Sequence, residues 1–141
     1  MIESGEFYTL KGYEMNSERK LTSAMEDYLE MIYRILTESA VARISEVSEK
    51  LHVTPSSASK MMKQLKEAGF VNGEKYGYVT LTEAGKAMGE YLYRRHYIIN
   101  RFLSVLNGTA DETEQAEKIE HFLSPRTVAN LARLTETLEK E

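Results

Sequence analysis

The segment LHVTPSS, residues 51–57, is the feature that most limits the folds open to this chain. It separates two short stretches in which apolar residues recur with helical spacing, the first of them at residues 44–51. In the second, Thr54 is a typical N-cap residue and Pro55 suits the first helical position, so we predict a helix from here to about Ala68. Two short helices with so tight a turn between them form a helix-turn-helix pattern.

A hairpin signal follows directly in the sequence FVNGEKYGYVTLT, residues 70–82. Its β-branched and aromatic residues flank two turn dipeptides, Asn72-Gly73 and Tyr76-Gly77, and the tip of a two-stranded hairpin can lie at either one. A hairpin in this place is typical of the wing of a winged helix-turn-helix.

Amphipathic helices are predicted on both sides of this segment. Apolar residues repeat every 3.6 residues from about Arg19 to Glu38. Capping and stop signals then predict a helix from Thr82 to about Leu106, one from Thr109 (with a capping box to Glu112) to Leu123, and one from Ser124-Pro125 to about Leu138. We expect a mainly α protein with an N-terminal arm at 1–18, a winged helix-turn-helix domain at 19–82 and an all-helical domain at 83–141.

The amino-acid composition excludes several kinds of site and partner. The 141 residues include no cysteine, which excludes disulfides, Cys-ligated zinc and iron–sulfur clusters. The formal charge of −4 excludes a polycation, yet residues 40–82 hold six basic against four acidic residues and are the one positive segment between acidic flanks. No apolar stretch suits a membrane span or a signal peptide, so we expect a soluble, cytoplasmic protein without a membrane partner.

The positive segment carries candidate contacts to double-stranded DNA. Small hydroxyl and lysine side chains at the start of the third helix suit the major groove, and a wing can touch the neighbouring backbone. A solvated polar helix face is the alternative, which the local charge and the adjacent hairpin disfavour. The candidate DNA-binding residues are Thr54, Ser56, Ser57, Ser59, Lys60, Lys63, Lys75 and Tyr76.

Carboxylates and histidines outside that segment form a second constellation. Asp27 and Glu30 project on one side of the first helix, opposite its apolar stripe, and E-x-x-E-H at residues 117–121 lies on one face of a later helix. His96 lies on the long helix. Oxygen donors with a few imidazoles suit Mn²⁺ or Fe²⁺. Taken singly, each group also fits an ordinary surface ion pair with Arg34 or a packed histidine.

These motifs together resemble the diphtheria-toxin-repressor family of metal-dependent transcriptional regulators, and most closely its manganese transport regulator branch. The stretches that carry the resemblance are SAMEDYLEMIY (23–33), ARISEVSEKLHVTPSSASKMMKQLKEAGFV (42–71), YGYVTLTEAGK (76–86), YRRHYIINRFL (93–103) and EKIEHFLS (117–124). The resemblance implies a homodimeric repressor of metal uptake that binds operator DNA when it holds metal, with two ions per subunit expected. The ligands that it implies are Asp27, Glu30, His96, Glu117, Glu120 and His121.

Two details refine this expectation. Glu117 stands where the iron-sensing branch has cysteine, which favours the manganese type, and Asn100 replaces a carboxylate that relatives often use in an ancillary site. We also expect no counterpart of the SH3-like third domain of longer relatives.

Two other classes of function were weighed. A winged-helix regulator of a small organic ligand leaves the polar clusters unexplained, and thiol redox sensing lacks a cysteine. A small di-metal hydrolase or oxygenase needs an open metal position and a further general acid or base, which no motif supplies. We therefore expect no enzymatic activity.

Overall fold

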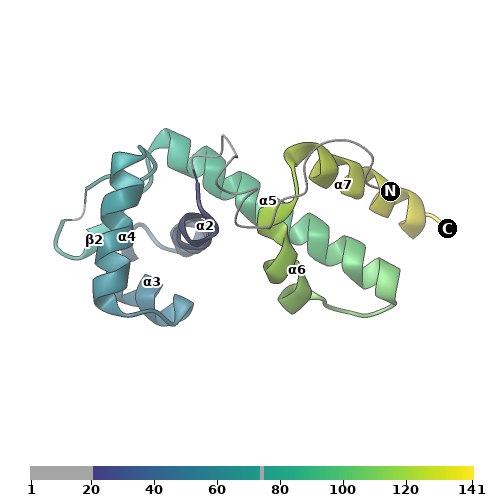
Figure 1. Ribbon diagram of the computed structural model, residues 1–141, viewed down its shortest axis with the longest axis horizontal. Coiled ribbons are helices and arrows are strands. Elements are labelled where there is room, and N and C mark those ends of the chain that lie inside the picture. The colour runs from purple at the N-terminus through teal and green to yellow at the C-terminus, as the bar shows by residue number, and fades with distance from the viewer. Residues whose placement is uncertain (1–20, 74) are drawn as a thin grey trace, which may run out of the picture.

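The computed structural model describes residues 21–73 and 75–141, so the predicted arm lies outside the described residues (Figure 1). Two groups of short elements lie at opposite ends of one long helix. The elements in chain order are α2 (Ser23–Glu38), β1 (Ala42–Arg43), α3 (Ile44–Leu51), α4 (Pro55–Glu67), β2 (Tyr78–Val79), α5 (Glu83–Asn107), α6 (Thr113–Ile119), the 3-10 helix η1 (Glu120–Phe122) and α7 (Pro125–Glu139). The architecture is a winged helix-turn-helix followed by a helical domain, which confirms the predicted fold class.

The helix ends of the first half follow local capping chemistry. The hydroxyl of Thr22 accepts a hydrogen bond from the backbone of Met25 at 3.1 Å, and that of Thr54 accepts one from Ser57 at the same distance. Pro55 occupies the start of α4 as predicted. A hydrophobic core lies between α2, α3, α4 and the sheet, and the largest of its fully buried side chains include Leu29, Ile32, Val47, Leu65 and Val79.

The wing turns at Tyr76-Gly77, which decides between the two predicted tips. Both residues have positive φ, 57° and 81°, as a type I′ turn requires. Lys75 and Tyr78 exchange backbone hydrogen bonds of 3.1 Å across the turn. The sheet itself was not fully predicted, because β2 pairs antiparallel with β1, a two-residue strand that is too short to show a period.

Helix α5 connects both halves of the molecule (Figure 1). Its first part packs against α2, and its second part supports α6 and α7. A second, smaller hydrophobic core forms there from Ile99, Leu103, Ala116 and Val128. In residues 21–73 and 75–141, no helix is long and apolar enough to cross a membrane.

The predicted helix from Thr109 to Leu123 is wrong in its bounds. The hydroxyl of Thr109 donates to the carboxylate of Glu112 at 2.9 Å and caps no backbone amide in a capping box, so α6 begins only at Thr113. A carboxylate of Asp111 instead accepts from the backbone of Thr113 at 3.2 Å. The last turn tightens into η1, which presents Glu120 and His121 from a 3-10 helix.

We predict that Gly85→Ala destabilises the protein by about 3 kcal/mol. A Cβ at Gly85 would lie 1.9 Å from the carbonyl oxygen of Phe70, so backbone must move at the point where α5 leaves the wing. Urea unfolding with a chelator present measures the loss. Gly73→Ala is the matched control, because its Cβ would meet only the flexible end of Lys66 at 3.0 Å. Equal stability of the two variants would contradict the packing argument.

Candidate metal centre

A layer of buried charged residues separates the two hydrophobic cores. We call it the charged layer, and α2, α5 and η1 each contribute two of its residues, all at most 8% exposed. They are Glu26 and Glu30, Arg95 and His96, and Glu120 and His121. Burying charges without partners costs several kcal/mol or more, so their pairing decides whether this layer stabilises the fold.

One group of potential ligands lies entirely inside this layer. Glu30, His96 and Glu120 each offer an oxygen or nitrogen atom, and these atoms lie within 4.8 Å of one another. Nδ1 of His96 is 2.7 Å from Oε2 of Glu120. That hydrogen bond raises the pKa of His96, while burial, followed by the nearby Glu120 carboxylate, raises the pKa of Glu30. Without a cation, the group therefore tends to hold protons.

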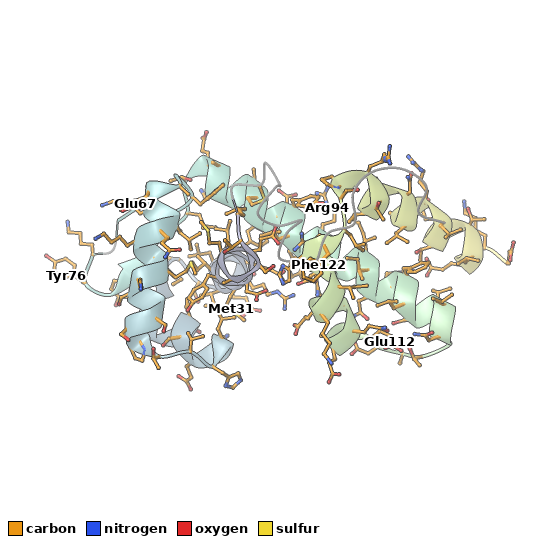
Figure 2. All side chains as sticks on the ribbon, in the orientation of Figure 1. Met31, Glu67, Tyr76, Arg94, Glu112 and Phe122 are labelled. Atoms are coloured by element: carbon orange, nitrogen blue, oxygen red, sulfur yellow. The ribbon has the colours of Figure 1, made fainter. Side chains whose placement is uncertain are left out.

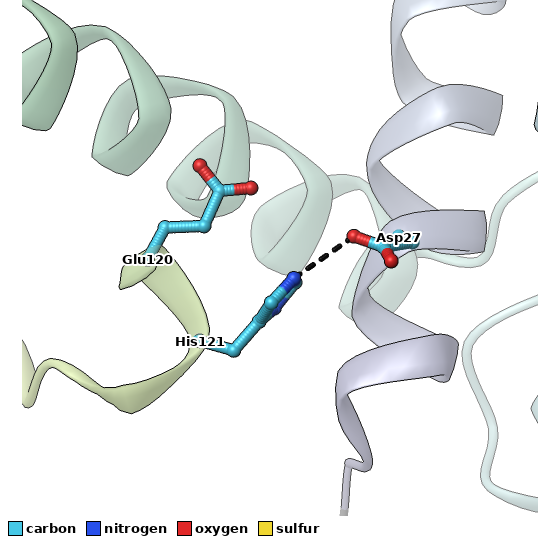
Figure 3. Close-up of side chains that lie close together, drawn as sticks. All are labelled: Asp27, Glu120 and His121. Atoms are coloured by element: carbon cyan, nitrogen blue, oxygen red, sulfur yellow. Dashed lines mark ion pairs between the residues drawn. The ribbon is translucent and has the colours of Figure 1, made fainter. Parts of the chain in front are cut away.

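A second group lies at the solvent edge of the layer and is formed by Asp27, Glu120 and His121 (Figure 3). Nε2 of His121 lies 3.0 Å from Oδ1 of Asp27. The side chain of Asp27 is half exposed, whereas Glu120 is fully buried, so the group is open to solvent on the side of α2. Glu120 belongs to both groups and could offer one carboxylate oxygen to each.

The donor set of these groups fits a hard or borderline divalent cation. It consists of carboxylate oxygens and imidazole nitrogens, with no sulfur, which suits Mn²⁺ and Fe²⁺. Five of the six predicted ligands take part. Glu117 lies exposed near the end of α6 and enters neither group among the described residues, so its role as a ligand stays a prediction.

Two arginines supply positive charge to the same region. Nη2 of Arg34 lies 2.5 Å from Oε2 of Glu30, and the guanidinium group of Arg34 also stacks over the ring of Tyr93 at 5.2 Å. Arg95 is buried and reaches the carboxylate of Glu26 with both terminal nitrogens, at 3.3 and 3.4 Å. The two guanidinium groups therefore reduce the repulsion between the buried carboxylates.

Sequence reasoning missed Glu26. Its Oε1 lies 2.8 Å from Nδ1 of His121, and its side chain is buried. In the sequence it looks like an ordinary acidic residue in the first turn of a helix. Its spacing of four residues from Glu30 was the available signal, because residues i and i+4 share one helix face.

The electrostatics of His121 follow from this arrangement. Burial alone would lower its pKa, but hydrogen bonds with Asp27 and Glu26 raise the pKa to about 9. At neutral pH and without metal, the imidazole therefore carries a proton that a cation bound at its nitrogen has to displace.

The predicted DNA-contacting residues form an exposed surface on α4 and the wing. Ser56, Ser57, Ser59, Lys60 and Lys63 are exposed, whereas Ala58, Met62 and Leu65 on the other face of α4 are buried. Tyr76 is 87% exposed at the outer end of the molecule, with Nζ of Lys75 5.7 Å from the centre of its ring (Figure 2). The hydroxyl of Thr54 accepts the hydrogen bond that caps α4.

Asn100 has a structural role in place of a carboxylate. Its Nδ2 donates to Asp111 at 3.1 Å and to Thr113 at 3.3 Å, and its Oδ1 accepts from the backbone of Glu112 at 2.7 Å. These bonds hold the loop between α5 and α6. The hydrogen bonds from Thr113 and Asn100 also lower the pKa of Asp111.

We predict that His121 makes the metal-free protein more stable at low pH than at high pH. Because its pKa is raised from 6.5 to about 9, its contribution is fully present below pH 6.5 and is lost as the pH rises through 9. The loss is of the order of 3 kcal/mol at most. Urea unfolding in chelator at pH 6 and pH 9.5 measures it as the difference between wild type and His121→Gln. His52→Asn, at an exposed histidine with left-handed φ, is the control, and an unchanged difference would contradict the pairing.

We also predict that Asn100→Asp lowers the midpoint of urea unfolding. The new carboxylate keeps the acceptor for Glu112 but loses the donor and faces Asp111. Asp111→Asn in the same chain should restore most of the midpoint, because donor and acceptor are then exchanged. If Asp111→Asn did not restore stability, the proposed role of Asn100 in holding the loop between α5 and α6 would be contradicted.

Two family models match the chain over almost all of the described residues. The "Iron dependent repressor, N-terminal DNA binding domain" matches residues 20–79, and the "Iron dependent repressor, metal binding and dimerisation domain" matches residues 82–141. A curated relative, the "HTH-type transcriptional regulator MntR" of Lysinibacillus sphaericus (strain C3-41), is 36% identical over 121 residues, which are 84% of this chain and 86% of that protein.

Solved structures agree with this relationship. The manganese regulator SloR is 32% identical and superposes with a TM-score of 0.69 over 82% of this chain and 55% of its own. A manganese-dependent transcriptional repressor in complex with manganese is 28% identical, with a TM-score of 0.70 over 79% and 52%. The chain thus spans about half the length of these solved relatives. With matching models over both halves and a relative above 30% identity, the chain belongs to the iron-dependent repressor family of metal-dependent transcriptional regulators.

Proposed function

We propose that this protein is a DNA-binding transcriptional regulator that Mn²⁺ or Fe²⁺ activates, with repression of metal uptake as its output. One observation carries the proposal: both groups of potential metal ligands join α2 of the DNA-binding half to η1, and one of them also includes His96 of α5. A cation bound there would tie the two halves together. The family models and the manganese-dependent relatives support the same function.

The ligand residues explain how a cation would act. Asp27, Glu30 and Glu120 would supply negative charge to a cation, and a protonated His96 or His121 would release a ring proton in order to bind it. The bound metal supplies a multivalent charge that no single side chain can replace. The arrangement that holds all ligands at once is then favoured over arrangements in which α2 stands apart from η1.

Glu120 supports a stoichiometry of two ions per subunit. It belongs to both groups, so each group would have one oxygen of its carboxylate available to hold a cation. We also propose that Glu117 completes one site, which would require the end of α6 to rotate at its junction with η1. The oxygen and nitrogen donors suit both ions, and manganese is favoured over iron by the manganese regulators among the relatives.

The DNA surface and the dimer complete the proposal. The exposed face of α4 would enter the major groove of operator DNA, with Lys75 and Tyr76 on the neighbouring backbone. Exposed apolar side chains on the second half, including Tyr97 and Leu134, suit a homodimer interface. Two recognition helices held at a fixed distance by that interface would match two half-sites, in the cytoplasm where the DNA is.

An organic effector is less well supported. Among the described residues, one cavity lies between α5 and α7, and its volume of about 270 Å³ is small for such a ligand. Charged residues of that cavity, Arg101 and Glu139, pair with each other.

We predict that Glu120→Gln abolishes Mn²⁺-dependent binding of operator DNA, because it removes charge from both groups at once. Fluorescence anisotropy of labelled promoter DNA, with and without Mn²⁺, measures the effect. Lys60→Ala is the matched variant from the other surface: it should weaken DNA binding while Mn²⁺ affinity, measured by calorimetry, stays within about twofold. Wild-type binding of equal affinity in excess chelator would refute metal activation.

A further inference from the structure

We propose that Glu26, held by Arg95, is a positioning residue that fixes the imidazole of His121 so that its Nε2 faces the metal. The inference rests on the proposed function and assigns a role to a buried ion pair outside the predicted ligand set. Glu26 and Arg95 are among the least exposed charged residues of the described chain, at 6% and 3%.

The two nitrogens of His121 face different partners. Nδ1 lies 2.8 Å from Oε1 of Glu26 and, at the longer distance of 3.4 Å, near Nη2 of Arg95. Nε2 lies 3.0 Å from Oδ1 of Asp27, within the group that offers ligand atoms (Figure 3). A neutral imidazole carries its proton on one nitrogen and offers a lone pair on the other. With Nδ1–H donating to Glu26, the lone pair is therefore on Nε2, which faces Asp27 and Glu120.

Arg95 orients the carboxylate of Glu26 as a hydrogen-bond acceptor for His121. Its two terminal nitrogens reach both carboxylate oxygens, at 3.3 and 3.4 Å, and a guanidinium group does not lose its charge in proteins. Its guanidinium also stacks over the ring of Tyr91 at 6.0 Å, which restrains the side chain. Glu26 thus stays an acceptor for Nδ1–H and, among the described residues, belongs to neither group of potential ligands.

The ion pair of Glu26 and Arg95 also joins the elements that carry the ligands. Glu26 lies on α2, Arg95 on α5 and His121 on η1, so all three elements meet at one carboxylate before any cation binds. Because these contacts already hold the ring of His121, cation binding does not have to order it. Outer partners of this kind commonly change metal affinity by about 10- to 100-fold.

A purely structural ion pair is the alternative, and a double-mutant cycle separates the two. Glu26→Gln keeps the size of the side chain but removes its charge. We expect it to weaken Mn²⁺ binding by calorimetry about 10- to 100-fold in the wild-type chain and by less than about twofold in the His121→Gln background. Equal losses in both backgrounds would overturn the proposal, because the effect would then not pass through His121.

Arg95→Met should weaken Mn²⁺ binding in the same direction. Its matched control is Arg94→Met, on the neighbouring residue of α5, whose guanidinium pairs with Glu90 at 2.9 Å on the exposed surface. Arg94→Met should leave Mn²⁺ affinity unchanged. Equal losses in the two arginine variants would count against positioning.

A measurement on the wild-type chain does not depend on any variant folding. In the protein loaded with diamagnetic Zn²⁺, ¹⁵N NMR of the histidine rings should show a proton on Nδ1 of His121 and the metal on Nε2. Metal on Nδ1 would overturn the proposal. Wild type that fails to bind Mn²⁺ would overturn the proposed function as well, whereas wild type that binds it with Glu26→Gln unaffected overturns only the role of Glu26.

Discussion

The contacts between buried charges at the junction of α2, α5 and η1 determine how the two halves of this protein meet. The larger hydrophobic core ends on α5 at Leu92 and the smaller one begins at Ile99, so apolar packing is continuous within each half and interrupted between them. The interval is filled by Arg95 and His96 together with acidic residues of α2 and η1. Such a layer is stable only when its charges are paired. Most of these pairs join two elements, and the pair of Glu30 with Arg34 lies within α2.

The layer carries more acidic than guanidinium groups. Its carboxylates and Asp27 outnumber the two arginines that contact them, and the raised pKa values of His96 and His121 show that protons help to restore the balance. A divalent cation can take the place of those protons at the same nitrogens. In the proposed function, protons and metal would therefore compete for the same layer, and the outcome would change how firmly η1 holds α2.

Residue patterns predicted most of the fold because most of it is local. Thr54-Pro55 and Thr82 set helix starts by capping, and the wing follows from glycine and β-branched residues. The metal centre was predicted only in part: five of the six predicted ligands converge, whereas Glu117 lies exposed on α6 and enters neither group of the described residues. Glu26 and Arg95 were missed because burial of a charged pair depends on three elements meeting, which residue spacing along one helix does not contain.

Helix α2 explains how events in the charged layer can reach the DNA surface. Its buried carboxylates face α5 and η1, whereas Leu29, Ile32 and their apolar neighbours pack in the core shared with α3 and α4. Protein interiors are packed too densely for one face of a helix to move without the other. A cation that draws Asp27 and Glu30 toward η1 must therefore move or hold the whole helix-turn-helix, including the exposed face of α4. In the proposed dimer, such a movement would change the distance between the two recognition helices.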